Sequence, residues 1–277
     1  MATGFFTDTT LCIGCKACEV ACKQWNQLPA DGYAFSGNSY DNTMALGGTT
    51  WRHVAFVEQP APLDAPPSES KWLMVSDVCK HCTHAGCLEA CPTGAIVRNE
   101  FDSVYVQPDV CNGCGYCVPS CPFGVIDMIE HADYTRPSFP SDGRTDDDAL
   151  QRHGGVAGKC TLCYDRQKVG FTPACAKACP TDSIEFGEVE ELKARARTRV
   201  ATLRARGVDA RLYGIDEDNS IGDLNAFFLL TDRPATYNLP ERPVLPSTHQ
   251  PAAYGSAALA ALALGAIGCL VFRASAP

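Results

Sequence analysis

Four groups of closely spaced cysteines constrain this chain more than any other feature of its sequence. The first and third groups share the spacing C-x2-C-x2-C-x3-C, the second has two extra residues in its loop, and the fourth has an eleven-residue gap. Three groups end in similar strings, CPTGAI, CPFGVI and CPTDSI, which indicates an internal repeat. The groups are Cys12, Cys15, Cys18 and Cys22; Cys79, Cys82, Cys87 and Cys91; Cys111, Cys114, Cys117 and Cys121; and Cys160, Cys163, Cys175 and Cys179.

This spacing predicts iron–sulfur clusters. Three thiolates in a tight loop bind three corners of one 4Fe-4S cluster, and the fourth cysteine binds the neighbouring cluster, as in two-cluster bacterial ferredoxins. Sixteen ligands therefore make four 4Fe-4S sites. Only the first group lacks the proline after its last cysteine, because Lys23 stands there.

Two other uses of the cysteines fit the sequence less well. A disulfide framework fits poorly with 17 cysteines, an odd number, many of them two or three residues apart. Structural zinc needs two C-x2-C pairs per site and leaves the third cysteine of each group without a role. None of the six histidines is needed as a ligand. Lys16, Lys80 and Lys159 lie beside ligands, where they would either raise a cluster's potential or serve only solubility.

The gaps between groups predict which groups pair. Only 19 residues separate Cys91 from Cys111, against 56 between Cys22 and Cys79 and 38 between Cys121 and Cys160. Groups two and three therefore pair locally, and group one is left with group four. The predicted ligand sets are Cys12, Cys15, Cys18 and Cys179; Cys160, Cys163, Cys175 and Cys22; Cys79, Cys82, Cys87 and Cys121; and Cys111, Cys114, Cys117 and Cys91.

The predicted fold class is α+β, with two ferredoxin-like two-cluster units and one C-terminal transmembrane helix. Residues 75–130 form a unit inserted in a discontinuous unit of residues 1–74 and 131–230. Connectors at 58–70 and 136–155 are rich in Pro and Ser, which is typical of surface loops.

The remaining segments have simpler patterns. An amphipathic helix is expected from Gly187 to Arg206, with one apolar face of Val189, Leu192, Ala196, Val200 and Leu203. A short buried strand is expected at 226–231, followed by an extended Pro-rich tether at 231–251. Residues 252–272 carry no charge and are long enough, at about 30 Å as a helix, to cross a membrane.

Several stretches resemble the iron–sulfur beta subunit of respiratory formate dehydrogenase. They are CIGCKACEVACKQWN, TTWRHVAFVE, GCGYCVPSCPFGV and KCTLCYDRQKVGFTPACAKACPT. The resemblance implies a molybdo- or tungstopterin catalytic subunit and a membrane partner, a cytochrome b or other quinone-reactive subunit. It also implies that electrons enter near Cys12, Cys15 and Cys18 and leave near Cys111, Cys114 and Cys117. Nitrate reductase relatives have tryptophan where this chain has Cys114, which favours four 4Fe-4S clusters and a partner other than nitrate reductase.

The net charge and the two ends of the chain indicate which partners and which compartment to expect. The formal charge of −9, without a basic stripe, argues against a nucleic-acid partner. The N-terminus carries no signal peptide of its own, so the cluster domain would reach the outside only folded and bound to an exported catalytic partner, as the resemblance implies. Arg273, just beyond the apolar segment, favours a cytoplasmic C-terminus and hence a cluster domain that is anchored in the cell membrane and extracytoplasmic; the alternative is a domain that faces the cytoplasm. No catalytic motif or substrate of its own is indicated. The alternatives are the same role beside another molybdopterin oxidoreductase or a hydrogenase, a free multi-cluster ferredoxin, and a zinc-stabilised scaffold.

Overall fold

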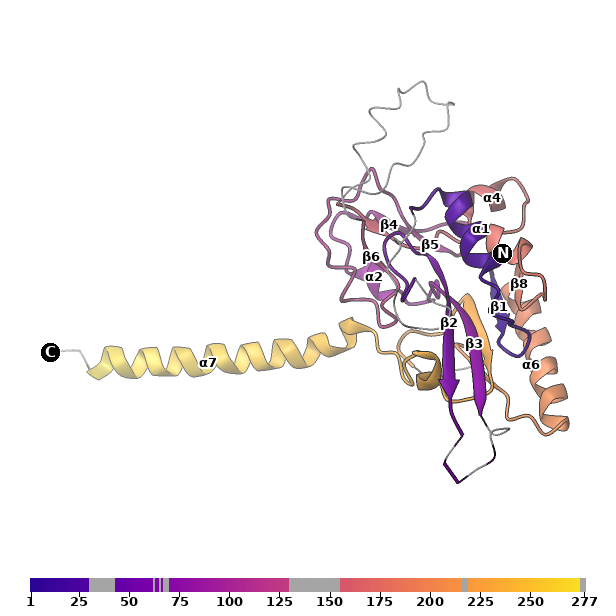
Figure 1. The fold of residues 1–277 in the computed structure, drawn as a ribbon. Helices are drawn as coiled ribbons and strands as arrows, with labels where there is room; N and C mark the ends of the chain where they lie inside the picture. The colour runs from indigo at the N-terminus through magenta and orange to yellow at the C-terminus, as the bar shows by residue number, and fades with distance from the viewer. Residues whose placement is uncertain are drawn as a thin grey trace, which may run out of the picture.

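The computed structural model describes residues 1–29, 43–61, 63–64, 66, 70–129, 155–215 and 219–274. All sixteen motif cysteines lie within these ranges, whereas nearly all of the predicted loop at 136–155 and part of the one at 58–70 lie outside them. The described part combines short helices with small sheets, and one long helix projects from it (Figure 1). Both kinds of element are present, as expected of an α+β chain.

The largest sheet joins the two ends of the cysteine-rich region. Its strands lie in the order β8 (Ile184–Glu188), β1 (Thr3–Asp8), β10 (Ala226–Leu230) and β9 (Arg211–Tyr213). β1 pairs in parallel with β10 and antiparallel with β8, and β10 pairs antiparallel with β9. All five residues of β10 are buried, which confirms the predicted strand. The chain before the first cysteine group and the chain after the fourth therefore share one sheet.

Helix α6 (Val189–Ala205) packs on this sheet. The five apolar residues predicted for its inner face are all buried, and all but Val189 belong to the cluster that contains Phe6, Phe227 and Leu229 of the sheet. The helix begins beside Glu190 and Glu191 and ends before Gly207, whose φ of 80° suits a helix stop. The predicted helix is thus confirmed to within two residues at its N-terminus.

Four short helices carry or adjoin the cysteines. They are α1 (Ala17–Asn26), α2 (Gly86–Glu89), α4 (Tyr164–Lys168) and α5 (Ala174–Lys177). α1 contains Cys18 and Cys22 of the first group, and it packs against α5, which contains Cys175 of the fourth group. This contact brings together two segments about 150 residues apart in the sequence.

Three two-stranded ladders complete the sheet structure. They are β2 (Arg52–Gln59) with β3 (Lys71–Val78), β4 (Ile96–Arg98) with β5 (Val104–Val106), and β6 (Asp127–Met128) with β7 (Ala157–Gly158), all antiparallel. The β4 and β5 pair lies between the second and third groups. The β2 and β3 hairpin places Arg52 opposite Val78, directly before Cys79.

The segment at 231–251 differs from the extended tether that we expected. It forms two 3-10 turns, η3 (Pro234–Tyr237) and η4 (Pro246–His249), and Tyr237, Leu239 and Leu245 are buried against β9 and β10. The prolines indicated an extended chain, but the apolar residues between them pack on the sheet. The segment is therefore part of the folded body.

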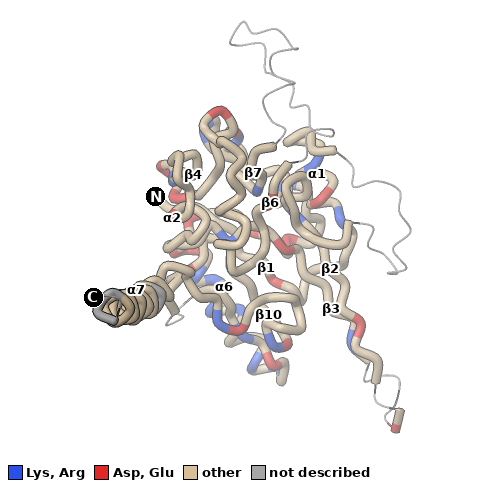
Figure 2. The backbone as a smooth tube through the Cα atoms, turned by 90° about the vertical axis from the view of Figure 1, so that its left-hand side faces the viewer, with Lys and Arg blue, Asp and Glu red and all other residues tan. Residues whose placement is uncertain are grey.

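Helix α7 (Gln250–Ala274) then leaves that body (Figure 1). Residues Pro246–Val271 are long and apolar enough to cross a membrane, and none of this stretch is buried in the structure. Figure 2 shows charged residues over α6, whereas residues 252–272 of α7 carry no charge. The predicted C-terminal apolar helix is present.

Candidate functional site

Cysteines of the first and fourth groups line one cavity. Cys12, Cys15, Cys18 and Cys179 surround it together with Ser76 and Ile184, and it encloses about 290 Å³ including its open mouth. Burial raises the pKa of Cys18 to about 12, although Arg52 and Ser76 act in the opposite direction. Cys15 is exposed, so this cavity lies near the surface.

A second cavity is lined by cysteines of the second group and the last cysteine of the third. Cys79, Cys82, Cys87 and Cys121 surround about 350 Å³. Burial raises the pKa of Cys87 to about 12, and Lys159 opposes this shift. In each of the two cavities, the last cysteine of a distant group lies with the three loop cysteines of another group.

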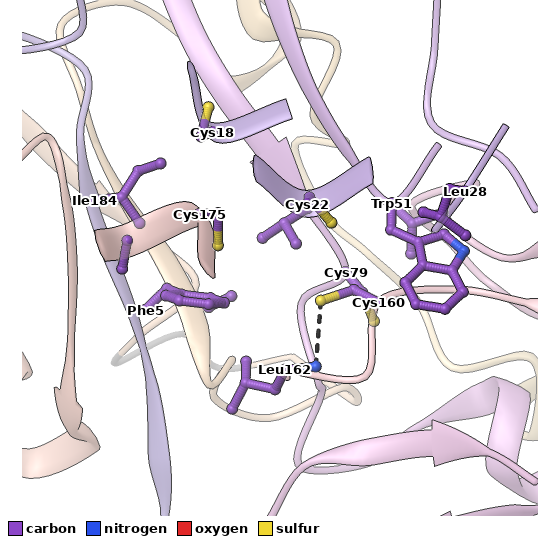
Figure 3. Packing of buried hydrophobic residues seen from close by; sticks show 14 of the residues in the cluster. Phe5, Cys18, Cys22, Leu28, Trp51, Cys79, Cys160, Leu162, Cys175 and Ile184 are labelled. Carbon is purple, nitrogen blue, oxygen red and sulfur yellow. Dashed lines mark hydrogen bonds between the residues drawn. The ribbon is translucent and has the colours of Figure 1, made fainter. Parts of the chain in front are cut away.

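A third set of thiols lies in the centre of the core. Burial raises the pKa of Cys22 well above its ordinary value, and Cys160, Cys175 and Cys163 raise it further. All four side chains are buried. Figure 3 shows several of these sulfurs among Phe5, Leu162 and Ile184, with the hydrogen bond of 3.3 Å from Leu162 N–H to Cys160 Sγ.

The fourth set lies near the surface, as the first set does. Burial raises the pKa of Cys117 to about 11, and Cys111, Cys114 and Cys91 add to the shift. Cys114 is exposed, and Cys111 and Cys91 are half-buried. The structure thus places Cys179 in one cavity with Cys12, Cys15 and Cys18, and Cys121 in another with Cys79, Cys82 and Cys87. The four complete ligand sets stay a prediction.

The same backbone turn recurs in every group. The residue before the second cysteine has positive φ in all four: Gly14 at 67°, His81 at 45°, Gly113 at 75° and Leu162 at 55°. Left-handed residues in such loops turn successive N–H groups toward one concave face, which binds anions and iron–sulfur centres. Glycine adopts this conformation easily, but His81 and Leu162 gave no sign of it in the sequence.

The first group ends differently because it lacks the proline. In the other groups the chain turns after the last cysteine, at Gly94, Gly124 and Asp182, which all have positive φ. Helix α1 instead continues through Cys22 to Asn26. Lys23 Nζ donates to Pro29 O at 2.8 Å and to Thr50 Oγ1 at 2.9 Å, which holds the following chain in place.

Buried cations lie among the sulfurs: Arg52, Lys159 and Lys80, the last of which forms an ion pair with Asp77. Arg52 is 1% exposed, and its guanidinium stacks on the Phe5 ring with Cζ 4.8 Å from the ring centroid. Lys159 is 2% exposed, and its Nζ lies 3.3 Å from Cys79 Sγ. Arg52 gave no signal in the sequence, because nothing in its local pattern shows that the β2 and β3 hairpin ends beside the thiols.

The donors fit an iron–sulfur cluster better than a single metal ion. Among the described residues, no three His, Cys, Asp or Glu side chains form a group that would hold one ion. Each of the two cavities is lined by four cysteines instead, with buried cations nearby and an otherwise largely apolar wall. Such a wall suits a bulky anion whose charge is spread over many sulfurs.

Comparison with known proteins agrees with this geometry. One family model, described as a 4Fe-4S dicluster domain, matches residues 70–136 and 147–189, and another of the same description matches residues 11–95. The formate dehydrogenase iron–sulfur subunit of Haemophilus influenzae is 39% identical over 242 residues, which cover 85% of this chain and 68% of the relative. The formate dehydrogenase-O iron–sulfur subunit of Escherichia coli is 39% identical over 247 residues, 87% of this chain and 72% of the relative.

The chain belongs to the family of formate dehydrogenase iron–sulfur subunits. A more distant relative, the thiosulfate reductase electron transfer subunit of Salmonella typhi, is 35% identical over 185 residues, 66% of this chain and 74% of the relative. Two dicluster domains imply four 4Fe-4S clusters, which confirms the predicted cofactors. This family member is thus a non-catalytic electron-transfer subunit, and the zinc and disulfide interpretations are set aside.

Two glycines of the third group provide a matched test of the loop geometry. Gly113 and Gly115 both have φ of 75°, but a Cβ at Gly113 would collide with Gly155 O, whereas at Gly115 it would meet nothing within 4 Å. Gly115→Ala carries only the left-handed strain, about 1–2 kcal/mol. We expect Gly113→Ala to lose about a quarter of the iron, one cluster in four, to an anaerobic chelator while Gly115→Ala stays close to wild type. Equal loss in both variants would contradict this geometry.

Proposed function

We propose that this chain is the electron-transfer subunit of a membrane-bound formate dehydrogenase, and that its clusters are held by the four swapped ligand sets. The observation that carries the ligand sets is the cavity lined by Cys12, Cys15, Cys18 and Cys179, because Cys179 is distant in sequence from the other three. Cys121 stands in the same relation to the second group. The printed names of the relatives support formate dehydrogenase as the complex.

The proposed arrangement of the two units is an insertion. The unit at 75–130 lies within a discontinuous unit of residues 1–74 and 131–230. Support comes from the contact of α1 with α5 and from the pairing of β1 with β8, which connect the first group to the fourth. The second group is tied to the surrounding unit, since Thr83 N–H donates to Asp223 O at 3.0 Å and Ala226 N–H donates to Lys80 O at 3.1 Å.

The proposed path runs from the first-group cluster through the central cluster of Cys160 and then the second-group cluster to the third-group cluster. One sulfur ligand is exposed at each end, Cys15 and Cys114, while all four cysteines of the Cys22 set are buried. Large apolar side chains are exposed beside both ends: Ile13 and Val20 near Cys15, and Val110 and Tyr116 near Cys114. Exposed apolar residues next to a redox centre fit partner contacts at both ends.

The clusters supply one-electron transfer along this path. The protein's own part is to hold the thiolates, to exclude water from the two central sets and to provide hydrogen-bond donors to sulfur. A molybdo- or tungstopterin subunit that oxidises formate would deliver electrons at the Cys15 end. A quinone-reactive membrane subunit would receive them at the Cys114 end.

Helix α7 is the proposed membrane anchor. Leu259, Leu262, Leu264 and Leu270 are each about two-thirds exposed or more, and an apolar helix of this length is stable when lipid or a partner helix covers it. The cluster domain is proposed to lie on the extracytoplasmic side, because Arg273 near the end of α7 favours a cytoplasmic C-terminus.

The anchor is tested by truncation before Gln250. We expect the truncated chain to keep its iron but to leave the membrane fraction, because the 3-10 turns that precede α7 remain packed on the body. The side is tested by protease digestion of intact spheroplasts, to which an extracytoplasmic domain is accessible. A truncated chain that stays in the membrane fraction would contradict the anchor. A cluster domain that is protected from protease would contradict the extracytoplasmic side.

The ligand sets are tested by Cys179→Ser. Because Cys179 lies with Cys12, Cys15 and Cys18, its loss should alter the cluster of the first group and leave the Cys160 cluster intact. Cys175→Ser is the matched variant, expected to alter the Cys160 cluster. Electron paramagnetic resonance of the reduced protein distinguishes the two. Loss of only the Cys160 cluster in Cys179→Ser would overturn the swapped sets.

The complex is tested by its electron donor. Purified from detergent in its native form, it should contain a pterin subunit, and formate should reduce the clusters, seen as bleaching of their visible absorbance and as new paramagnetic signals. Thiosulfate in place of formate is the control, because one relative is named as a thiosulfate reductase subunit. A complex that contains no pterin subunit, or whose clusters formate leaves oxidised, would refute the formate assignment.

A further inference from the structure

Arg52 is buried with donors that lack acceptors in the protein. Its Nη1 donates to Ser76 Oγ at 3.2 Å and to Ser76 O at 3.3 Å. Its Nε and Nη2 have no hydrogen-bond partner among the residues that the structure describes. A buried N–H without an acceptor is destabilising, and more so when the group is charged. The site therefore requires acceptors that come from something other than these residues.

The surroundings of Arg52 indicate what those acceptors are. Burial acts to lower the pKa of Arg52, but Cys175, Cys18, Cys160 and Cys22, rather than any carboxylate, raise it. Cys18 belongs to the first ligand set, and the other three belong to the central set. Ser76 Oγ also lies 3.2 Å from Cys18 Sγ, so the serine joins the guanidinium to the first set. Arg52 thus stands between two successive clusters of the proposed path.

Lys159 occupies the corresponding place one step further. Its Nζ approaches Cys79 Sγ at 3.3 Å and Cys160 O at 3.1 Å, and it also donates to Val104 O. Three acceptors match the three donors of an ammonium group. Cys79 belongs to the set of the second group, and Cys160 to the central set. Lys159 therefore stands between the second and third clusters of the path.

We propose that Arg52 and Lys159 are positioning residues, each of which holds a buried positive charge between two successive clusters and stabilises their reduced forms. This inference rests on the ligand sets proposed above. When one electron passes along the path, the donor cluster is oxidised and the acceptor is reduced, and no bond or proton need change. The acceptor gains one negative charge, which a nearby cation in a water-poor core stabilises strongly.

The placement predicts a pattern that a general loss of stability would not produce. Arg52→Met should lower the reduction potentials of the first-group and central clusters. Lys159→Met should lower those of the central and second-group clusters. The central cluster thus responds to both substitutions, and the Cys111 cluster to neither.

Lys177 supplies the control, since it is exposed and only two residues from both Cys175 and Cys179. Lys177→Met should leave all four reduction potentials unchanged, because water screens its charge.

The measurement is an anaerobic redox titration of the complete complex, with each cluster followed by its paramagnetic signal and iron determined in every variant. Arg52→Lys and Lys159→Arg keep the charge and should restore most of each shift. Unchanged potentials in the Met variants at full iron content, or an equal shift of all four clusters, would overturn the proposal.

Variants that fail to hold iron are also informative. If Arg52→Met and Lys159→Met lose iron while Arg52→Lys and Lys159→Arg keep it, the requirement for charge is seen in cluster retention and supports the proposal. If the charge-preserving variants lose iron equally, both residues serve packing and the proposal falls. The ligand sets are tested separately by Cys179→Ser, so a failure there is distinguishable from a failure here.

Discussion

Burial of thiols is the constraint on which the rest of this structure depends. Cys18, Cys22, Cys79, Cys160 and Cys175 take the places in the main core that aliphatic side chains hold in other proteins. Burial raises the pKa of several of them, so a metal-free core would contain protonated thiols around cavities. Iron displaces those protons and fills the cavities, and its binding energy becomes folding energy. Bound clusters would hold the short helices and the two-stranded ladders together.

The same constraint explains the placement of charge. A cluster with four thiolates is an anion in a core that excludes water, and a bare anion there is costly. The structure answers with N–H groups turned inward by positive-φ residues such as Gly14 and Leu162, and with the buried cations Arg52 and Lys159. Figure 3 shows how closely sulfur, ring and aliphatic groups pack in this region. Residues that compensate the clusters' charge therefore also govern how electrons move between them.

Much of this could be predicted from the sequence, because cysteine spacing is a local pattern with a strong chemical meaning. Helix α6 and strand β10 were predicted for a similar reason, since an apolar face with period near 3.6 and a short apolar run each mark one kind of element. The packing of Tyr237 and Leu245 was missed because prolines dominate the local pattern there. Arg52 and His81 were missed because their roles arise from contacts between segments far apart in the chain.

The central claim is that this family member carries four 4Fe-4S clusters, and anaerobic determination of iron and acid-labile sulfide per chain tests it most directly. The account predicts about sixteen atoms of each, four of each per cluster. Zinc without labile sulfide, or about half that iron, would contradict it.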